Sequence, residues 1–219
     1  RLAGFTFLFY IAVGLTAMAI DNRAMNAEGT AAKLVRMAEH AADVRATLVL
    51  SVLMSLSALV LAVTLHALTR DEDADLALLA LSCRVGEGLV GLAGIPATLG
   101  LLRLATSAAA PGAPDPAGAN ALAGYLLSVG DGGVLVCAIL FAVGSTLFGY
   151  LFLRARTIPT ALAWLGVIAS VLLVVALPAQ LGGVLKGPLT MYVWMPMLLF
   201  EVTFALWLMI KGVAARAPR

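Results

Sequence analysis

The stretch TLVLSVLMSLSALVLAVTLHAL, residues 47–68, decides the fold class of this chain. His66 is its only residue with an acidic or basic side chain, and a charged cluster at residues 70–73 follows shortly after it. A helix needs about 20 mostly apolar residues to cross the roughly 30 Å of hydrocarbon in a bilayer. A helix on the surface of a soluble protein keeps a polar face, which this stretch lacks. Residues 47–68 therefore predict a transmembrane helix.

Five more apolar runs have the same character. They predict further spans at residues 2–20, 75–102, 133–153, 158–177 and 191–210, and Pro96 interrupts the second of these. We expect the first run to be retained as a helix, because no small-residue cleavage site stands out after it. The predicted fold class is an all-α membrane protein, a six-transmembrane-helix bundle with amphipathic interfacial segments. Residues 1–219 are expected to form a single transmembrane domain.

The composition supports a membrane protein and excludes several other classes. The chain is 62% hydrophobic and 12% charged, against about 45–50% and about 25% in soluble domains. A net charge of +2, spread in short clusters, is too weak for a nucleic-acid-binding surface. The two cysteines lie in separate apolar runs without zinc or redox spacing. We expect a lipid bilayer as the environment, with no nucleic-acid partner, no metal and no cofactor.

Two connections between spans are long. Between residues 21 and 46, apolar side chains recur at helical spacing, which predicts an amphipathic interfacial helix from about Thr30. The second connection begins with the linker-like sequence AAAPGAPDP, residues 108–116. A second short interfacial helix is predicted over residues 119–129.

The distribution of basic residues predicts the orientation in the membrane. Cytoplasmic loops of membrane proteins carry an excess of Lys and Arg, and short loops count most. One side of the predicted topology carries Arg1, Arg70, Arg154, Arg156, Lys211, Arg216 and Arg219. The other side carries Arg23, Lys33, Arg36, Arg45, Arg103 and Lys186, four of which lie in the long first loop. Both termini are therefore expected in the cytoplasm.

Three charged residues fall inside the predicted spans: Arg84, Glu87 and Glu201. Arg84 and Glu87 are three residues apart and share a helix face. At about 1.5 Å per residue, Arg84 lies roughly 14 Å inside from Asp75, and Glu201 roughly 15 Å inside from Lys211. We therefore expect a buried cluster of these three residues, with His66 as a possible contributor. The alternative for His66 is a surface or capping role.

Two interpretations of this cluster stay open. It can be a structural clamp that joins spans three and six, because one guanidinium has enough donors for two carboxylates. It can also be a proton or ion relay, or a ligand site reached from the cytoplasm, because intramembrane charges are costly and often functional. Two carboxylates against one Arg leave a net negative site. The nearby GEGLVG, residues 86–91, matches a dinucleotide-binding pattern only in letters, because that motif requires a preceding strand.

A series of short motifs follows along essentially the whole chain: RLAG at 1–4, Val44-Arg45, CRVGE at 83–87, FGYL at 148–151, Arg154, Ile158-Pro159, residues 196–201, ALWL at 205–208 and Lys211-Gly212. In this order and spacing, the motifs resemble those of the domain of unknown function 4386 family of bacterial six-span membrane proteins. The chain departs from the family pattern at Leu65-His66 and at residues 160–164. The resemblance implies a six-helix bundle in a bacterial inner membrane and marks Arg84, Glu87 and Glu201 as family-pattern positions. It implies no activity.

The sequence shows no catalytic constellation, since no nucleophile and base can be placed at matched depth. We expect a non-enzymatic protein, either an accessory subunit or a binder of a small ligand or lipid. Such a role allows a membrane-protein partner or a homo-oligomer. The alternative is a small transporter or proton-coupled carrier that uses Arg84, Glu87 and Glu201, although the two halves lack the similarity of many carriers.

Overall fold

The computed structural model describes residues 1–107 and 115–213, and these form helices without any strand. The helices are α1 Leu2–Met25, α2 Thr30–Glu39, α3 Ala41–Thr69, α4 Ala74–Ala93, α5 Ile95–Thr106, α6 Pro116–Ala155, α7 Thr160–Leu181, α8 Leu189–Tyr192 and α9 Met195–Ile210. Six segments are long and apolar enough to cross a membrane: α1, α3, α4 with α5, α6, α7, and α8 with α9. The predicted fold class, a six-span all-α membrane bundle, is confirmed.

The amphipathic segment predicted from about Thr30 is present as α2. The separate helix predicted over residues 119–129 is wrong, because those residues belong to the single long helix α6. Asp115 caps α6 by accepting a hydrogen bond from the Gly118 N–H at 2.7 Å, and Pro116 occupies its first turn. The glycines near residue 130 lower the local hydropathy, which makes the segment resemble a break between two helices. No proline follows Pro116 within α6, so the backbone hydrogen bonds of the helix continue through these glycines. Of the predicted linker, residues 108–114 lie outside the described residues.

The third span is divided where Pro96 predicts a break. Helix α4 ends at Ala93, and α5 begins at Ile95 with Pro96 in its first turn. Proline has no N–H to donate and its ring clashes with the preceding turn, so the helix restarts at that point. The Gly94 N–H bonds back to the Gly91 carbonyl at 3.3 Å, which joins the two helices tightly.

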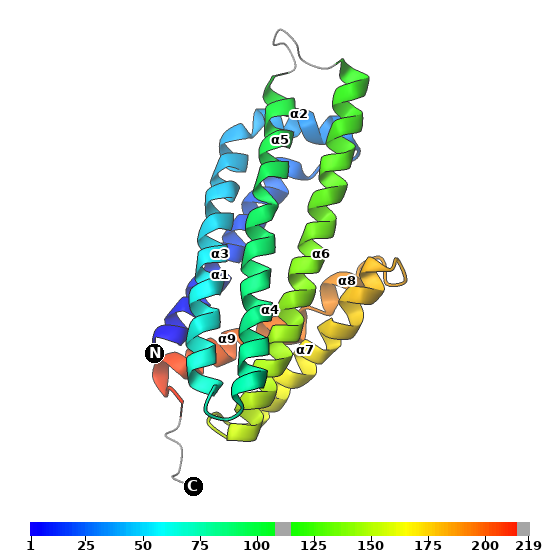
Figure 1. Cartoon of the computed structure of the whole chain (residues 1–219). Coiled ribbons are helices and arrows are strands. Elements are labelled where there is room, and N and C mark those ends of the chain that lie inside the picture. The colour runs from blue at the N-terminus through cyan, green and yellow to red at the C-terminus, as the bar shows by residue number, and fades with distance from the viewer. Residues whose placement is uncertain (108–114, 214–219) are drawn as a thin grey trace.

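The six spans close a ring in the half of the molecule that is drawn as the lower half in Figure 1. Going round it, α1 packs on α3, α3 on α4, α4 on α6, α6 on α7, α7 on α9 and α9 on α1. In Figure 1 the N-terminus and the C-terminal end of α9 lie in the lower part of the molecule, together with the α3–α4 turn and the α6–α7 connection. Helices α7, α8 and α9 occupy the lower half, whereas α5 and the first half of α6 rise above them and α2 crosses near the top (Figure 1).

Two apolar cores follow this division. The larger core fills the ring with buried side chains from α1, α3, α4, α6, α7 and α9. The smaller core holds α2 against the upper halves of α1, α3, α5 and α6, and it contains Ala24, Met37, Val44, Leu101, Leu102 and Ala123. Close backbone contact completes the ring at α1 and α9, where a Cβ on Gly4 would lie 2.7 Å from the Ala205 carbonyl oxygen. Small residues permit such approach between membrane helices.

Candidate functional site

The interior of the ring holds an ion pair. Arg84 is 1% exposed, and its Nη1 lies 2.7 Å from Oε2 of Glu87 one turn further along α4. The Tyr10 hydroxyl, from α1, donates a hydrogen bond to Oε1 of Glu87 at 3.0 Å. The guanidinium carbon also lies 4.7 Å from the centre of the Phe141 ring, a cation–π distance. Both oxygens of Glu87 are therefore engaged, one by a cation and one by a neutral donor.

A glycine on α6 makes room for this arginine. A Cβ at Gly144 would come within 2.9 Å of Cγ and 3.1 Å of Cδ of Arg84, and 3.2 Å of the Ala80 carbonyl oxygen. The close approach of α6 to α4 thus depends on Gly144. It allows the Arg84 side chain to lie buried between α4 and α6.

Glu201 on α9 faces the same interior but does not join the ion pair. It is 8% exposed and interacts electrostatically with Arg84 and Glu87. Among the described residues, no basic nitrogen lies within 4.0 Å of its carboxylate, and its Oε1 accepts no hydrogen bond. The structure thus pairs Arg84 with Glu87 and leaves Glu201 as a second buried carboxylate. With all three groups ionised, the net charge of the site is negative.

His66 lies away from this site. It is half-buried and sits three residues before the end of α3, where its carbonyl accepts the Arg70 N–H at 2.9 Å. Arg84 lies ten residues into α4, so the two side chains differ in depth by roughly 10 Å at about 1.5 Å per residue. The structure does not bring His66 to the Arg84–Glu87 pair.

A groove begins at Glu87 and runs toward the upper end of the molecule. Its inner cavity, of about 250 Å³, is lined by residues that include Tyr10, Ser55, Glu87 and Cys137. Its outer cavity, of about 350 Å³, includes Asp21 and Asp131. The two share Ser51, Gly91, Gly94, Gly130 and Val134. We call this continuous space the groove.

The groove opens on the apolar surface of the protein. Its walls come from α1, α3, α4, α5 and α6, and no residue of α7, α8 or α9 lines it. The rim residues Met18 and Val134 are 60% and 68% exposed, so the groove reaches the surface between α1 and α6. Its outer cavity is lined in part by residues of α5 and of the first half of α6, and these segments rise above α7, α8 and α9 in Figure 1. The access from the cytoplasmic side that the sequence suggests for the Arg84–Glu87–Glu201 cluster stays a prediction.

Glycines widen the groove on α6. A Cβ built at Gly130 or Gly133 would meet no atom within 4 Å, so neither glycine is required by helix packing. Gly132 also points into open space but does not line the groove. Glycine in a helix interior costs about 1 kcal/mol relative to alanine. The open space beside Gly130 and Gly133 is therefore kept at a cost to the helix.

Tyr10, Asp21 and Asp131 were not predicted as site residues. Asp131 carried a signal, an acidic residue within an apolar run, but the fourth span was predicted to begin at Gly133 and so excluded it. Asp21 was placed just outside the first span in the same way. Tyr10 occupies the middle of the first run, where a tyrosine needs a polar partner, and that signal alone could have pointed to it.

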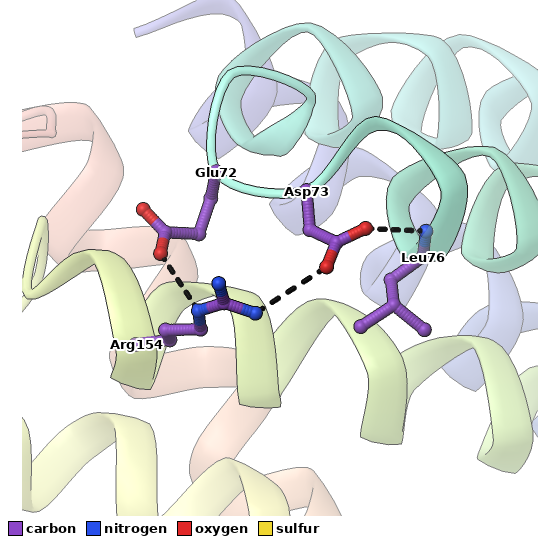
Figure 2. A network of polar contacts seen from close by, with 4 residues as sticks. All are labelled: Glu72, Asp73, Leu76 and Arg154. Atoms are coloured by element: carbon purple, nitrogen blue, oxygen red, sulfur yellow. Dashed lines mark hydrogen bonds and ion pairs between the residues drawn. The ribbon is translucent and has the colours of Figure 1, made fainter.

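A second ionic network lies at the lower end, outside the groove. Arg154 in the last turn of α6 places Nε 3.0 Å from Oε1 of Glu72 and Nη1 3.3 Å from Oδ2 of Asp73. Asp73 also caps α4, since its Oδ1 accepts the Leu76 N–H at 3.1 Å (Figure 2). The Glu72 side chain is 2% exposed. This network fastens the α3–α4 turn to α6 and so stiffens the end opposite the groove.

A family model described as "Domain of unknown function (DUF4386)" matches residues 2–212. No curated protein and no solved structure matches the chain. The matched range includes all six spans and every residue that lines the groove.

Proposed function

The chain belongs to the domain of unknown function 4386 family, and since that description carries no activity, we propose a function from the site alone. The protein is a non-enzymatic, membrane-embedded binding protein that takes one small, largely apolar molecule from the lipid into the groove. The polar end of the molecule lies against Tyr10 and Glu87. Small-molecule sites combine apolar walls with a few placed polar groups in this way.

The observation that carries this proposal is the open space beside Gly130 and Gly133. Glycines that face a neighbouring helix are explained by close packing, but these two face the groove and touch nothing there. Alanine at either position would fit and would strengthen the helix. Gly132 is equally open outside the groove, so it is the adjoining cavities of about 250 Å³ and about 350 Å³ that favour a bound molecule beside Gly130 and Gly133.

The inner end of the groove supplies the polar contacts. Glu87 lines the inner cavity although its carboxylate is held by Arg84 and by the Tyr10 hydroxyl. A carboxylate has about four lone-pair sites, so Glu87 can accept a further hydrogen bond from a ligand. The Cys137 thiol, which donates to the Glu87 carbonyl at 3.4 Å, lies beside it. The ion pair thus fixes the position of a ligand-facing acceptor.

The proposed setting is a bacterial inner membrane with both termini in the cytoplasm, which the basic residues of the short loops favour. The groove then opens in the half of the protein away from the cytoplasm. A membrane-protein partner or a second copy of the chain is compatible with this role. An accessory-subunit function without a ligand is the competing proposal.

Purification in a mild, uncharged detergent, followed by mass spectrometry of all retained molecules, tests the proposal. We expect one small molecule to remain bound at near-stoichiometric amount after extensive washing. A stoichiometric protein partner together with an empty groove would instead establish the accessory-subunit role. Heat-denatured protein from the same preparation provides the control, since it should release the molecule.

A second candidate, a proton-coupled carrier, is favoured by Glu201. A buried carboxylate without a cation of its own is costly in the membrane and can take up a proton instead. We expect that adding ligand to proteoliposomes that contain the protein moves protons across the membrane, and that a pH-sensitive dye inside the vesicles reports this movement. Glu201→Gln should abolish proton movement and leave ligand binding within about twofold, a difference of about 0.4 kcal/mol. Unchanged proton movement in that variant would exclude Glu201 as the proton site.

A further inference from the structure

We propose that the ligand of the groove is an uncharged apolar alcohol, whose hydroxyl group lies in the inner cavity, donates a hydrogen bond to Glu87 and accepts one from Ser55. This inference rests on the function proposed above. It keeps the polar end of the ligand at Tyr10 and Glu87, and it adds the chemical class of that end. The apolar tail follows the groove outward to the surface of the protein.

The main observation is at Ser55 on α3. This residue lines the inner cavity and is 7% exposed. Its hydroxyl nevertheless forms no hydrogen bond within the part of the chain that the structure describes. A buried hydroxyl without a partner costs free energy, because it has lost its hydration, and most buried polar groups in proteins are therefore hydrogen-bonded. A ligand in the inner cavity can supply the partner that Ser55 lacks.

Two other serines of α3 show the usual way to satisfy such a hydroxyl. A serine inside a helix can donate to the backbone carbonyl four residues earlier. Ser51 donates to the Thr47 carbonyl at 2.8 Å, and Ser57 donates to the Leu53 carbonyl at 2.7 Å. Ser55, which lies between them, forms no such bond. Ser51 also lines the inner cavity, but its proton is already used, so the free hydroxyl proton is that of Ser55.

Glycines on α4 leave room for this hydroxyl. A Cβ built at Gly91 would lie 3.1 Å from Oγ of Ser55, and a Cβ built at Gly88 would lie 3.4 Å from the Ser55 carbonyl oxygen. Both glycines line the inner cavity, and Gly88 directly follows Glu87 in sequence. Ser55 and Glu87 therefore lie on packed helices at similar depth, and both border the same cavity.

The donors and acceptors of the inner cavity select the polar group of the ligand. The Tyr10 hydroxyl and the Cys137 thiol already donate to Glu87. Ser55 therefore supplies the free side-chain donor among the described residues that line the cavity, and Glu87 supplies an acceptor. A hydroxyl group can donate one hydrogen bond and accept others, so a single alcohol group can serve both residues. An ether or ketone oxygen can only accept, and it would serve Ser55 alone.

The charge of the inner cavity favours an uncharged ligand. Among the described residues that line it, only Glu87 is acidic and none is basic. The Glu87 carboxylate already has a cation, because Nη1 of Arg84 lies 2.7 Å from its Oε2. An anionic head would meet this carboxylate without a cation to receive it, and a cationic head would compete with Arg84. Burying an unpaired charge costs far more than burying a hydroxyl that is hydrogen-bonded.

The test compares decan-1-ol with two probes of similar size that differ at the polar end. Methyl nonyl ether is an isomer of decan-1-ol that accepts but cannot donate a hydrogen bond, and decylammonium carries a positive charge. Binding to the full chain in phosphatidylcholine nanodiscs is measured by equilibrium dialysis, with empty nanodiscs subtracted. Affinities refer to the probe dissolved in the lipid, which removes differences in partitioning. We expect decan-1-ol to bind at least about tenfold more tightly than either other probe, a preference of about 1.4 kcal/mol.

Ser55→Ala tests the free hydroxyl. We expect it to weaken the binding of decan-1-ol and of the ether about fivefold each, a loss of about 1 kcal/mol, because both probes accept from Ser55. Ser57→Ala is the matched control, since Ser57 lies on the same helix, is 8% exposed, bonds to the backbone and lines neither cavity. It should leave both affinities unchanged. Alanine is as small as serine, so unchanged binding in Ser55→Ala would show that Ser55 serves only packing and would overturn its role.

The outcomes separate this inference from the proposed function. If the ether or the ammonium binds as tightly as decan-1-ol, and Gly130→Leu blocks both, the groove binds apolar molecules but the alcohol class is wrong. If no probe binds, the molecule retained on purification decides: an uncharged alcohol supports the inference, and any other molecule overturns it. If no probe binds and nothing is retained, both proposals fail. Unfolding curves show whether each variant is folded.

Discussion

Arg84→Met is expected to lower the free energy of unfolding by about 3–5 kcal/mol, because removing one partner of a buried ion pair leaves an uncompensated charge. Here the substitution leaves two buried carboxylates, Glu87 and Glu201, without a cation. Methionine retains most of the side-chain volume that packs on Gly144, so cavity formation adds little. Unfolding in mixed micelles with increasing dodecyl sulfate, followed by tryptophan fluorescence and circular dichroism, measures the change.

Two controls interpret this result. Arg70→Met removes a guanidinium whose ion pair with Asp71 is exposed on both sides, at 63% and 80%, and we expect it to cost less than Arg84→Met, because solvent screens exposed pairs. The triple variant Arg84→Met, Glu87→Gln and Glu201→Gln should recover most of the lost stability, because no charge is then left buried. A near-neutral Arg84→Met would show that the two carboxylates become hydrated or take up protons, and it would overturn the expected cost of an uncompensated buried charge.

The triple variant also separates the two interpretations of the cluster. A structural clamp predicts a folded triple variant that still binds its ligand, because Tyr10 and all other residues that line the groove are unchanged. A ligand site predicts a folded triple variant that has lost binding, because Glu87 supplies the inner acceptor. The distinction depends on comparing stability and binding in the same preparation.

The hydropathy of the sequence was sufficient to predict the six spans, because bilayer burial requires long apolar runs irrespective of tertiary contacts. The helix ends were less predictable. Asp21 and the glycine-rich segment around Asp131 interrupt the apolar pattern, yet α1 and α6 continue through both. Backbone hydrogen bonding inside the helix does not depend on side-chain polarity, so a change in hydropathy does not mark where a helix ends.

The site was predictable only where helical geometry decides it. The spacing of Arg84 and Glu87 places them on one face of any helix, and the structure shows their ion pair. Tyr10 joins them from a residue 77 positions away in the chain, and the groove exists because α7 and α9 stop short of the upper half. Neither the contact of Tyr10 nor the position of the groove follows from the sequence around a single residue. Both depend on how the six spans pack into a ring.

Filling the groove is expected to abolish ligand binding without harming the fold. In Gly130→Leu or Gly133→Leu, the new side chain enters a space where a Cβ meets no atom within 4 Å, so it displaces the ligand rather than protein atoms. We expect the affinity for the molecule retained on purification to fall at least about 100-fold, a loss of about 2.7 kcal/mol. The free energy of unfolding should stay equal or rise by up to about 1 kcal/mol, because leucine is a better helix former than glycine.

Gly132→Leu is the matched control for this loss of binding. It lies on the same helix between the two test positions, has the same open surroundings, and does not line the groove. It should gain the same helix stability and keep full affinity. If Gly132→Leu lost binding as strongly as its neighbours, the requirement would be for flexibility of α6 around Asp131 rather than for space. The difference between positions 130 and 132 therefore tests whether the groove itself holds the ligand.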